Sequence, residues 1–139
     1  MKTFLHKSAF YFLFICLGFV AISCDDDKDA TVEPTPTATI TISAPAENGF
    51  VTANDSATVS GTIQAAKNLH GYTISIRRKT DNVEIFRKES HAHNTTLSFS
   101  HKWFVEPVNA ATELELELIT ALDHAGNTAS KKVTFQARP

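Results

Sequence analysis

The stretch TELELELIT, residues 112–120, decides the fold of this chain. Its leucines alternate with its glutamates: Leu114, Leu116 and Leu118 against Glu113, Glu115 and Glu117. Successive side chains of a β-strand point to opposite faces, so the alternation gives a strand one apolar and one charged face. A helix, with its period of 3.6 residues, could not gather the glutamates on one side. We therefore predict a strand with its leucines buried and its glutamates in water.

The same period of two recurs in six further segments, each bounded by turn residues. They are residues 38–43, 57–64, 72–79, 82–90, 95–104 and 130–137. In the segment 95–104 the alternation places Leu97, Phe99 and Trp103 on one face. Seven strands in about 100 residues predict an all-β fold, an immunoglobulin-like antiparallel β-sandwich over residues 37–139.

Two phrases carry a resemblance to known modules. ISAPAENGFV (42–51) resembles the first-strand phrase of immunoglobulin-like modules of bacterial surface proteins, and ALDHAGNTASKKVTF (121–135) resembles their last hairpin. In that hairpin Asp123 is expected to cap the turn, and Gly126 and Asn127 tolerate positive φ. The chain thus resembles small immunoglobulin-like lipoproteins of Bacteroidota, several of them of unknown function. The resemblance implies a fold, not an activity.

The N-terminal residues indicate export. Lys2 and Lys7 precede an apolar run of 14 residues, 9–22. As a helix this run would measure roughly 21 Å, against about 30 Å of hydrocarbon in a membrane. A short apolar run behind a basic start is typical of a secretory signal peptide, which we predict for residues 1–23.

Small residues before Cys24 complete this signal. Ser23 and Ala21 stand at −1 and −3, and AISC (21–24) resembles a bacterial lipobox, although Ala21 stands where that motif more often has Leu. The resemblance implies that Cys24 becomes a lipid-bearing N-terminus. More than one acyl chain anchors firmly, because each buried CH₂ contributes about 0.8 kcal/mol.

An acidic run follows the cysteine. SCDDDKD (23–29) resembles the export tag of surface lipoproteins of Bacteroidota, and its acidic members are Asp25, Asp26, Asp27 and Asp29. The resemblance implies a protein anchored in the outer membrane and facing the cell exterior. A solvated spacer and the inner-membrane retention signal of enteric bacteria are the alternatives. Residues 24–36, rich in charge, Pro and Thr, are predicted to form a disordered tether.

Charge and cysteine content exclude several functions. Without residues 1–23 the chain carries 11 basic and 15 acidic residues, 11 − 15 = −4, and residues 37–139 carry ten of each. A neutral domain offers no electrostatic footprint for nucleic acid, so no nucleic-acid partner is expected. Cys16 leaves with the signal peptide and Cys24 is lipidated, so neither a disulfide nor a thiolate site is expected. The expected partners are the membrane, through Cys24, and a protein of the outer membrane.

The sequence offers little catalytic chemistry, and an enzyme is not expected. Asp123 and His124 are adjacent, so on a strand they would point to opposite faces, and no serine is placed to complete a triad. Glu113, Glu115 and Glu117 share a face, but a regular row of carboxylates about 6.5–7 Å apart is more often a wetted sheet surface.

Histidine is the unusual feature of residues 37–139. His91 and His93, two apart, could project from one face, and with His101 and His70 they are the candidate ligands for Zn²⁺ or Cu²⁺. His124 or Glu89 could complete such a site. The plainer interpretation is a group of polar residues near a hairpin end.

The predicted register argues against a tight metal site. We expect segments 82–90 and 95–104 to pair as a hairpin, and burial of Phe86 with Leu97 and Phe99 favours the register that turns His91 and His93 to water. That register separates both from His101. No cofactor is therefore expected.

These observations favour a lipid-anchored binding or accessory module on the cell surface, without catalysis. A metal-binding protein and a carbohydrate-binding module are the alternatives; Tyr72 and Trp103 would be the sugar-stacking aromatics of the latter, although most aromatics are expected in the core. Asp55-Ser56-Ala57 resembles the acceptor pattern for O-glycans on exported proteins of Bacteroidota, which implies modification at Ser56.

Overall fold

The computed structural model describes residues 37–139 of the 139-residue chain. This part consists of strands and loops. The strands are β1 (Ala38–Ala44), β2 (Phe50–Thr52), β3 (Ser56–Ala65), β4 (Gly71–Arg78), β5 (Glu84–Ser90), β6 (Thr96–Phe104), β7 (Thr112–Ala121) and β8 (Thr128–Arg138). All seven predicted strands are present, with ends displaced by at most two residues. The eighth, β2, was missed because three residues are too few to show a period.

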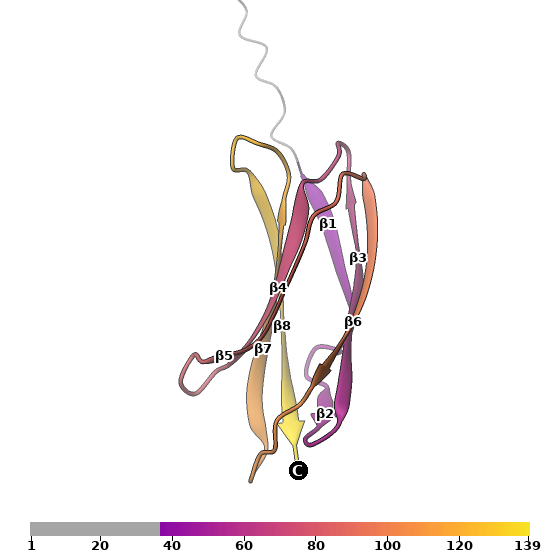
Figure 1. Ribbon diagram of the computed structural model, residues 1–139. Coiled ribbons are helices and arrows are strands. Elements are labelled where there is room, and N and C mark those ends of the chain that lie inside the picture. The colour runs from indigo at the N-terminus through magenta and orange to yellow at the C-terminus, as the bar shows by residue number, and fades with distance from the viewer. Residues whose placement is uncertain (1–36) are drawn as a thin grey trace, which may run out of the picture. The chain divides into compact units, whose positions relative to one another are not determined.

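The strands form two sheets packed face to face (Figure 1). One has the order β1-β3-β6 and the other β2-β8-β7-β4-β5. Neighbouring strands are antiparallel except β2 and β8, which pair in parallel. Thus the predicted antiparallel sandwich is confirmed, with one short parallel pair added at its edge.

The strand order is that of immunoglobulin-like sandwiches. In these domains the A, B and E strands share one sheet and the C, F and G strands share the other. Here β1, β3 and β6 occupy the first set of places, and β4, β7 and β8 occupy the second. The strand β5 extends the second sheet beside β4. The chain passes from β1 to β2, and so from one sheet to the other, through residues 45–49.

The core lies between the sheets and follows the predicted alternation. Leu114, Leu116 and Leu118 are at most 2% exposed. The register sets Leu114 opposite Phe135, which is fully buried. The ring of Phe135 meets Trp103 from the other sheet at 5.9 Å between centroids, so these two aromatics join the layers directly.

The predicted hairpin between residues 82–90 and 95–104 is wrong. The strand β5 pairs with β4, and β6 pairs with β3 in the other sheet. Phe86 does pack against the core, as expected, but it does so across the gap between the sheets, with its ring 6.1 Å from that of Trp103. Local periodicity could not reveal this, because an edge strand of either sheet shows the same alternation.

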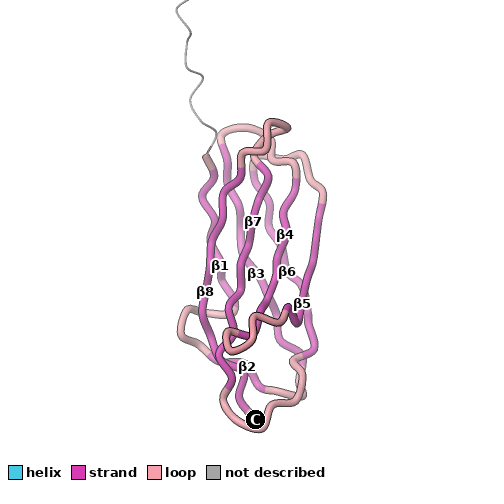
Figure 2. Tube along the Cα trace, turned by 90° about the vertical axis from the view of Figure 1, so that its left-hand side faces the viewer, coloured by secondary structure: helices cyan, strands magenta, loops and turns pink. Residues whose placement is uncertain are grey.

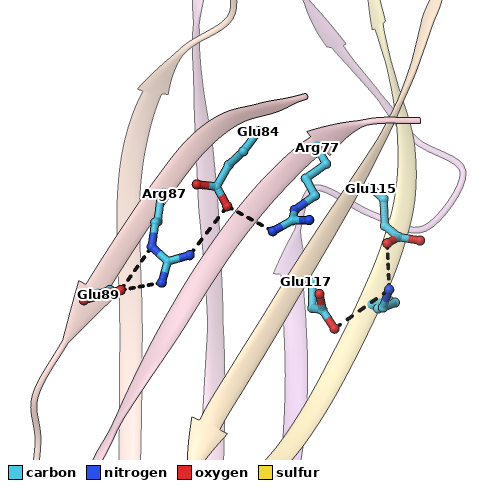
Figure 3. Close-up of polar contacts among 7 residues, drawn as sticks. Arg77, Glu84, Arg87, Glu89, Glu115 and Glu117 are labelled. Carbon is cyan, nitrogen blue, oxygen red and sulfur yellow. Dashed lines mark hydrogen bonds and ion pairs between the residues drawn. The ribbon is translucent and has the colours of Figure 1, made fainter. Parts of the chain in front are cut away.

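The outer face of the five-stranded sheet carries paired charges (Figure 3). Lys132 Nζ lies 2.8 Å from Glu115 and 3.8 Å from Glu117, and Glu84 bridges Arg77 and Arg87. The three cations are each at least 40% exposed, and their glutamate partners are 26–31% exposed, so solvent screens every pair and each contributes little to stability. The glutamate row of β7 is thus a wetted sheet surface, as predicted.

Candidate binding site at the loop end

Three loops meet at the end of the sandwich where β3, β5 and β7 finish (Figure 1; pink at the top of Figure 2). They are residues 66–70, 91–95 and 122–127. Each contributes one of the imidazoles that come together at this end: His70, His93 and His124. We call these three residues the histidine cluster.

Buried anchors hold the loops against the core. Leu69 is fully buried directly before His70, and Leu122 is 5% exposed two residues before His124. In the middle loop the half-buried Ala92 packs against the core before His93. Each histidine therefore follows closely on a side chain that fixes the backbone.

Backbone hydrogen bonds tie the loops to one another. The N–H of Leu69 donates to the carbonyl of Asn94 at 3.1 Å, and the N–H of His70 donates to the carbonyl of Ala121 at 2.9 Å. The loop of His70 is thus tied to the loop 91–95 and to the end of β7.

The loop that carries His124 is closed by Asp123. One carboxylate oxygen accepts from the N–H of Ala125 at 2.9 Å and of Asn127 at 3.0 Å, and the other accepts from Asn127 Nδ2 at 2.6 Å. The hydrogen bond from the Asn127 side chain, followed by the backbone N–H groups and the nearby His70, holds the pKa of Asp123 below its ordinary value. Gly126 takes φ of 90°. The predicted cap is present, and it fixes the turn on which His124 stands.

Within the histidine cluster His70 is the centre. Its ring lies 3.9 Å from that of His124 and 5.4 Å from that of His93, centroid to centroid. Its Nδ1 is shielded from solvent and has no hydrogen-bond partner among the described residues. His70 is half-buried, whereas His93 and His124 are exposed.

The structure divides the predicted metal ligands. His70 and His93 come together, while His91 is exposed in the same loop as His93 and His101 lies on β6. His101 Nε2 and the hydroxyl of Tyr72 are hydrogen-bonded at 2.9 Å. Burial, and then the charge of Lys88, lowers the pKa of His101. His91 and His93 are both exposed, but the register from which we expected this does not exist, because β5 and β6 do not pair.

His124 is the member that the sequence did not single out. The sequence marked His124 only as the neighbour of Asp123 and as a residue that could complete a metal site. The three histidines are separated by 23 and 31 positions, and no sequence period links such loops. As they stand, no three His, Cys, Asp or Glu side chains within residues 37–139 are arranged to hold a metal ion.

A shallow recess of about 190 Å³ adjoins the cluster. Its lining includes His70, Tyr72, Glu89, His91 and Ile119. It combines apolar surface with acceptor and donor groups, but it is smaller than the roughly 300–1,000 Å³ of pockets for drug-sized ligands.

The other candidate residues lie elsewhere. Ser56 is exposed at the start of β3, where its N–H donates to Asp55 Oδ1 at 2.6 Å; its glycosylation stays a prediction. Tyr72 and Trp103 are 8% and 5% exposed, so neither is free to stack on a sugar ring.

The export signals stay predictions. The signal peptide, Cys24 and its tether with Asp25, Asp26, Asp27 and Asp29 lie outside the described residues. Across residues 37–139, no helix is long and apolar enough to cross a membrane.

Comparisons with known proteins concern the fold alone. No protein-family model matches the chain, and no curated protein matches it. Among solved structures it is similar to fibronectin(III)-like modules of CbhA from Clostridium thermocellum, at 13% identity over 71% of this chain and 94% of that one, with a TM-score of 0.47. It is also similar to murine CRIg, at 12% identity over 73% and 97%, TM-score 0.43.

A third similar structure is a CARDB domain from Pyrococcus furiosus in complex with di-metal ions, at 10% identity over 78% and 100%, TM-score 0.45. Identities and TM-scores this low say nothing about the ligands of this chain.

Proposed function

We propose that this protein is a lipid-anchored, non-catalytic binding module of the outer membrane, which faces the cell exterior and binds through its loop end. The observation that carries the binding role is the convergence of three anchored loops on one histidine cluster beside a recess. Ligand sites built from loops on a rigid scaffold are common, because loops can vary without disturbing the core.

The entry point of the chain supports a role near the membrane. The strand β1 begins at Ala38, which is paired with Ala65 at the end of β3, so the chain enters the sandwich at the loop end. A tether from Asp25 to Pro36 could reach at most about 40 Å when fully extended. The loop end would therefore stay within reach of the membrane surface and of an outer-membrane protein partner.

The acidic side chains near the site favour binding over catalysis. The Asp123 carboxylate is occupied by three N–H donors, which stabilise its charged form and leave it poorly suited to accept a proton. Glu89, which lines the recess, is paired with Arg87.

The anchor is tested by changing Cys24. Cys24→Ala should remain an unprocessed precursor without lipid, because the only other cysteine, Cys16, is preceded by Phe14 and Ile15 rather than by small residues. Labelling with a fatty-acid analogue should mark the parent and not the mutant. Equal labelling of both would refute the anchor.

Surface display is tested with the acidic run. A variant with Asp25, Asp26 and Asp27 changed to alanine should keep its lipid but become protected from protease added to intact cells. The matched control changes Glu33, a tether acid outside the run, to alanine and should be digested like the parent. Digestion of the triple variant at the parental rate would show that the acidic run is only a spacer and not an export signal.

A further inference from the structure

We propose that His70, His93 and His124 together bind one divalent transition-metal ion, of which Zn²⁺ and Cu²⁺ are the representatives. This inference rests on the proposed function in one respect, since it names the ligand of the same loop end. Only His70 and His93 belong to the set expected from the sequence, so the site differs from that prediction.

The first step is the unpartnered nitrogen of His70. Buried polar atoms in native proteins nearly always have a partner, and an exception calls for a missing water, ion or ligand. Nδ1 of His70 is such an exception among the described residues, and it belongs to the ring on which the other two imidazoles converge.

The second step is the donor set. A neutral imidazole offers one nitrogen lone pair, and three imidazoles with an open fourth position are a recurrent zinc arrangement. The carboxylate of Asp123, beside His124, is occupied by Asn127 and Ala125, and that of Glu89, in the recess beside His70, is paired with Arg87. Nitrogen ligands without carboxylates suit Zn²⁺, Cu²⁺ and Ni²⁺ and do not suit Mg²⁺ or Ca²⁺.

The third step is the movement that binding requires. The rings now lie against one another and do not surround a common point. His93 and His124 are exposed, so their side chains can turn between rotamers at little cost. His70 is held by its backbone bond to Ala121 and by the buried Leu69. The ion would therefore draw two mobile imidazoles towards a fixed one.

Metal titration of the full chain tests the site. The protein is purified in detergent without a histidine tag, stripped with a chelator, and titrated with Zn²⁺ and with Cu²⁺ in a calorimeter at neutral pH. We expect one ion per chain at micromolar affinity or tighter, and no binding of Mg²⁺. Each of His70→Ala, His93→Ala and His124→Ala should weaken binding by at least about tenfold, because each removes one of three ligands.

The matched control is His91→Ala, which removes an exposed imidazole two positions from His93 in the same loop. It should bind the ion like the parent. Thermal unfolding of each metal-free variant separates loss of a ligand from loss of the fold, and His124→Gln repeats the test at an exposed position with a side chain of similar size.

Three outcomes would overturn the site. They are no binding by the folded parent, undiminished binding by the three cluster variants, and equal weakening by His91→Ala. Failure of the titration leaves lipid labelling and protease digestion of intact cells unchanged, and failure of those experiments leaves the titration unchanged. Failure of the metal site and failure of the anchored surface display are therefore distinguishable.

Discussion

At the scale of the residue, His101 makes the folding stability of the sandwich depend on pH. Its imidazole is partly buried on β6 beside the Tyr72 hydroxyl, and burial, then Lys88, lowers its pKa below the usual value of about 6.5. The unfolded chain therefore takes up a proton here at a higher pH than the folded protein does. The contribution of His101 to stability is present above about pH 6.5 and is lost as the pH falls through the folded-state pKa.

We expect His101→Phe, which cannot bind a proton, to lose less stability than the parent between pH 7 and pH 5. Urea unfolding at several pH values measures the difference. Tyr72→Phe is the companion variant, because it removes the hydroxyl but keeps the burial, and it should retain the parental acid sensitivity. An unchanged acid loss in His101→Phe would contradict this role.

At the scale of the element, two glycines shape the strand ends at the loop end, and they differ in a testable way. Gly71 opens β4 with φ of 124°, and an added Cβ would collide with the carbonyl oxygen of Ser90 on β5 and lie 3.2 Å from His91 Cα. Gly126 takes φ of 90° in the turn before β8, where an added Cβ would meet nothing within 4 Å. The backbone would strain an L-residue at both positions, but only at Gly71 would the added Cβ also collide with a neighbouring strand.

Gly126→Ala should therefore lower the free energy of unfolding by about 1–2 kcal/mol, the cost of left-handed backbone. Gly71→Ala should cost at least about 1 kcal/mol more, since β4 and β5 must separate. Chemical denaturation compares the two variants directly. Equal losses of unfolding free energy in the two variants would mean that β4 and β5 can move apart at Gly71 without cost.

At the scale of the whole molecule, a single core holds the two sheets together, and Phe135 and Trp103 join them. Phe135→Ala should cost about 3–5 kcal/mol through lost burial and the cavity left behind, a large share of the roughly 5–15 kcal/mol available to a small domain. Trp103 is the only tryptophan and is 5% exposed, so its fluorescence reports unfolding in urea.

Phe50 provides the control for that measurement. Phe50 is 62% exposed, and the guanidinium of Arg138 lies over its ring, 4.7 Å from the centroid. Phe50→Ala should cost less than about 1 kcal/mol. A loss in Phe135→Ala as small as that of Phe50→Ala would show that the sheets do not depend on this contact.

The sequence by itself determined seven of the eight strands, their inward faces and the sandwich. Side-chain alternation is a local property with a period of two, so Leu114, Leu116 and Leu118 could be assigned to the core without knowledge of their partners. The cap of the last hairpin was equally local, because Asp123 and Asn127 are four positions apart and bond to each other.

Only the tertiary structure decided how the strands pair and which histidines meet. The edge strand β5 joined β4 rather than β6, because pairing depends on which sheet each strand enters and not on its own pattern. His70, His93 and His124 converge because three loops lie at the same end of the sandwich, each next to a side chain that packs in or against the core. That convergence is set by the packing of residues far apart in the chain, which leaves no trace in local spacing.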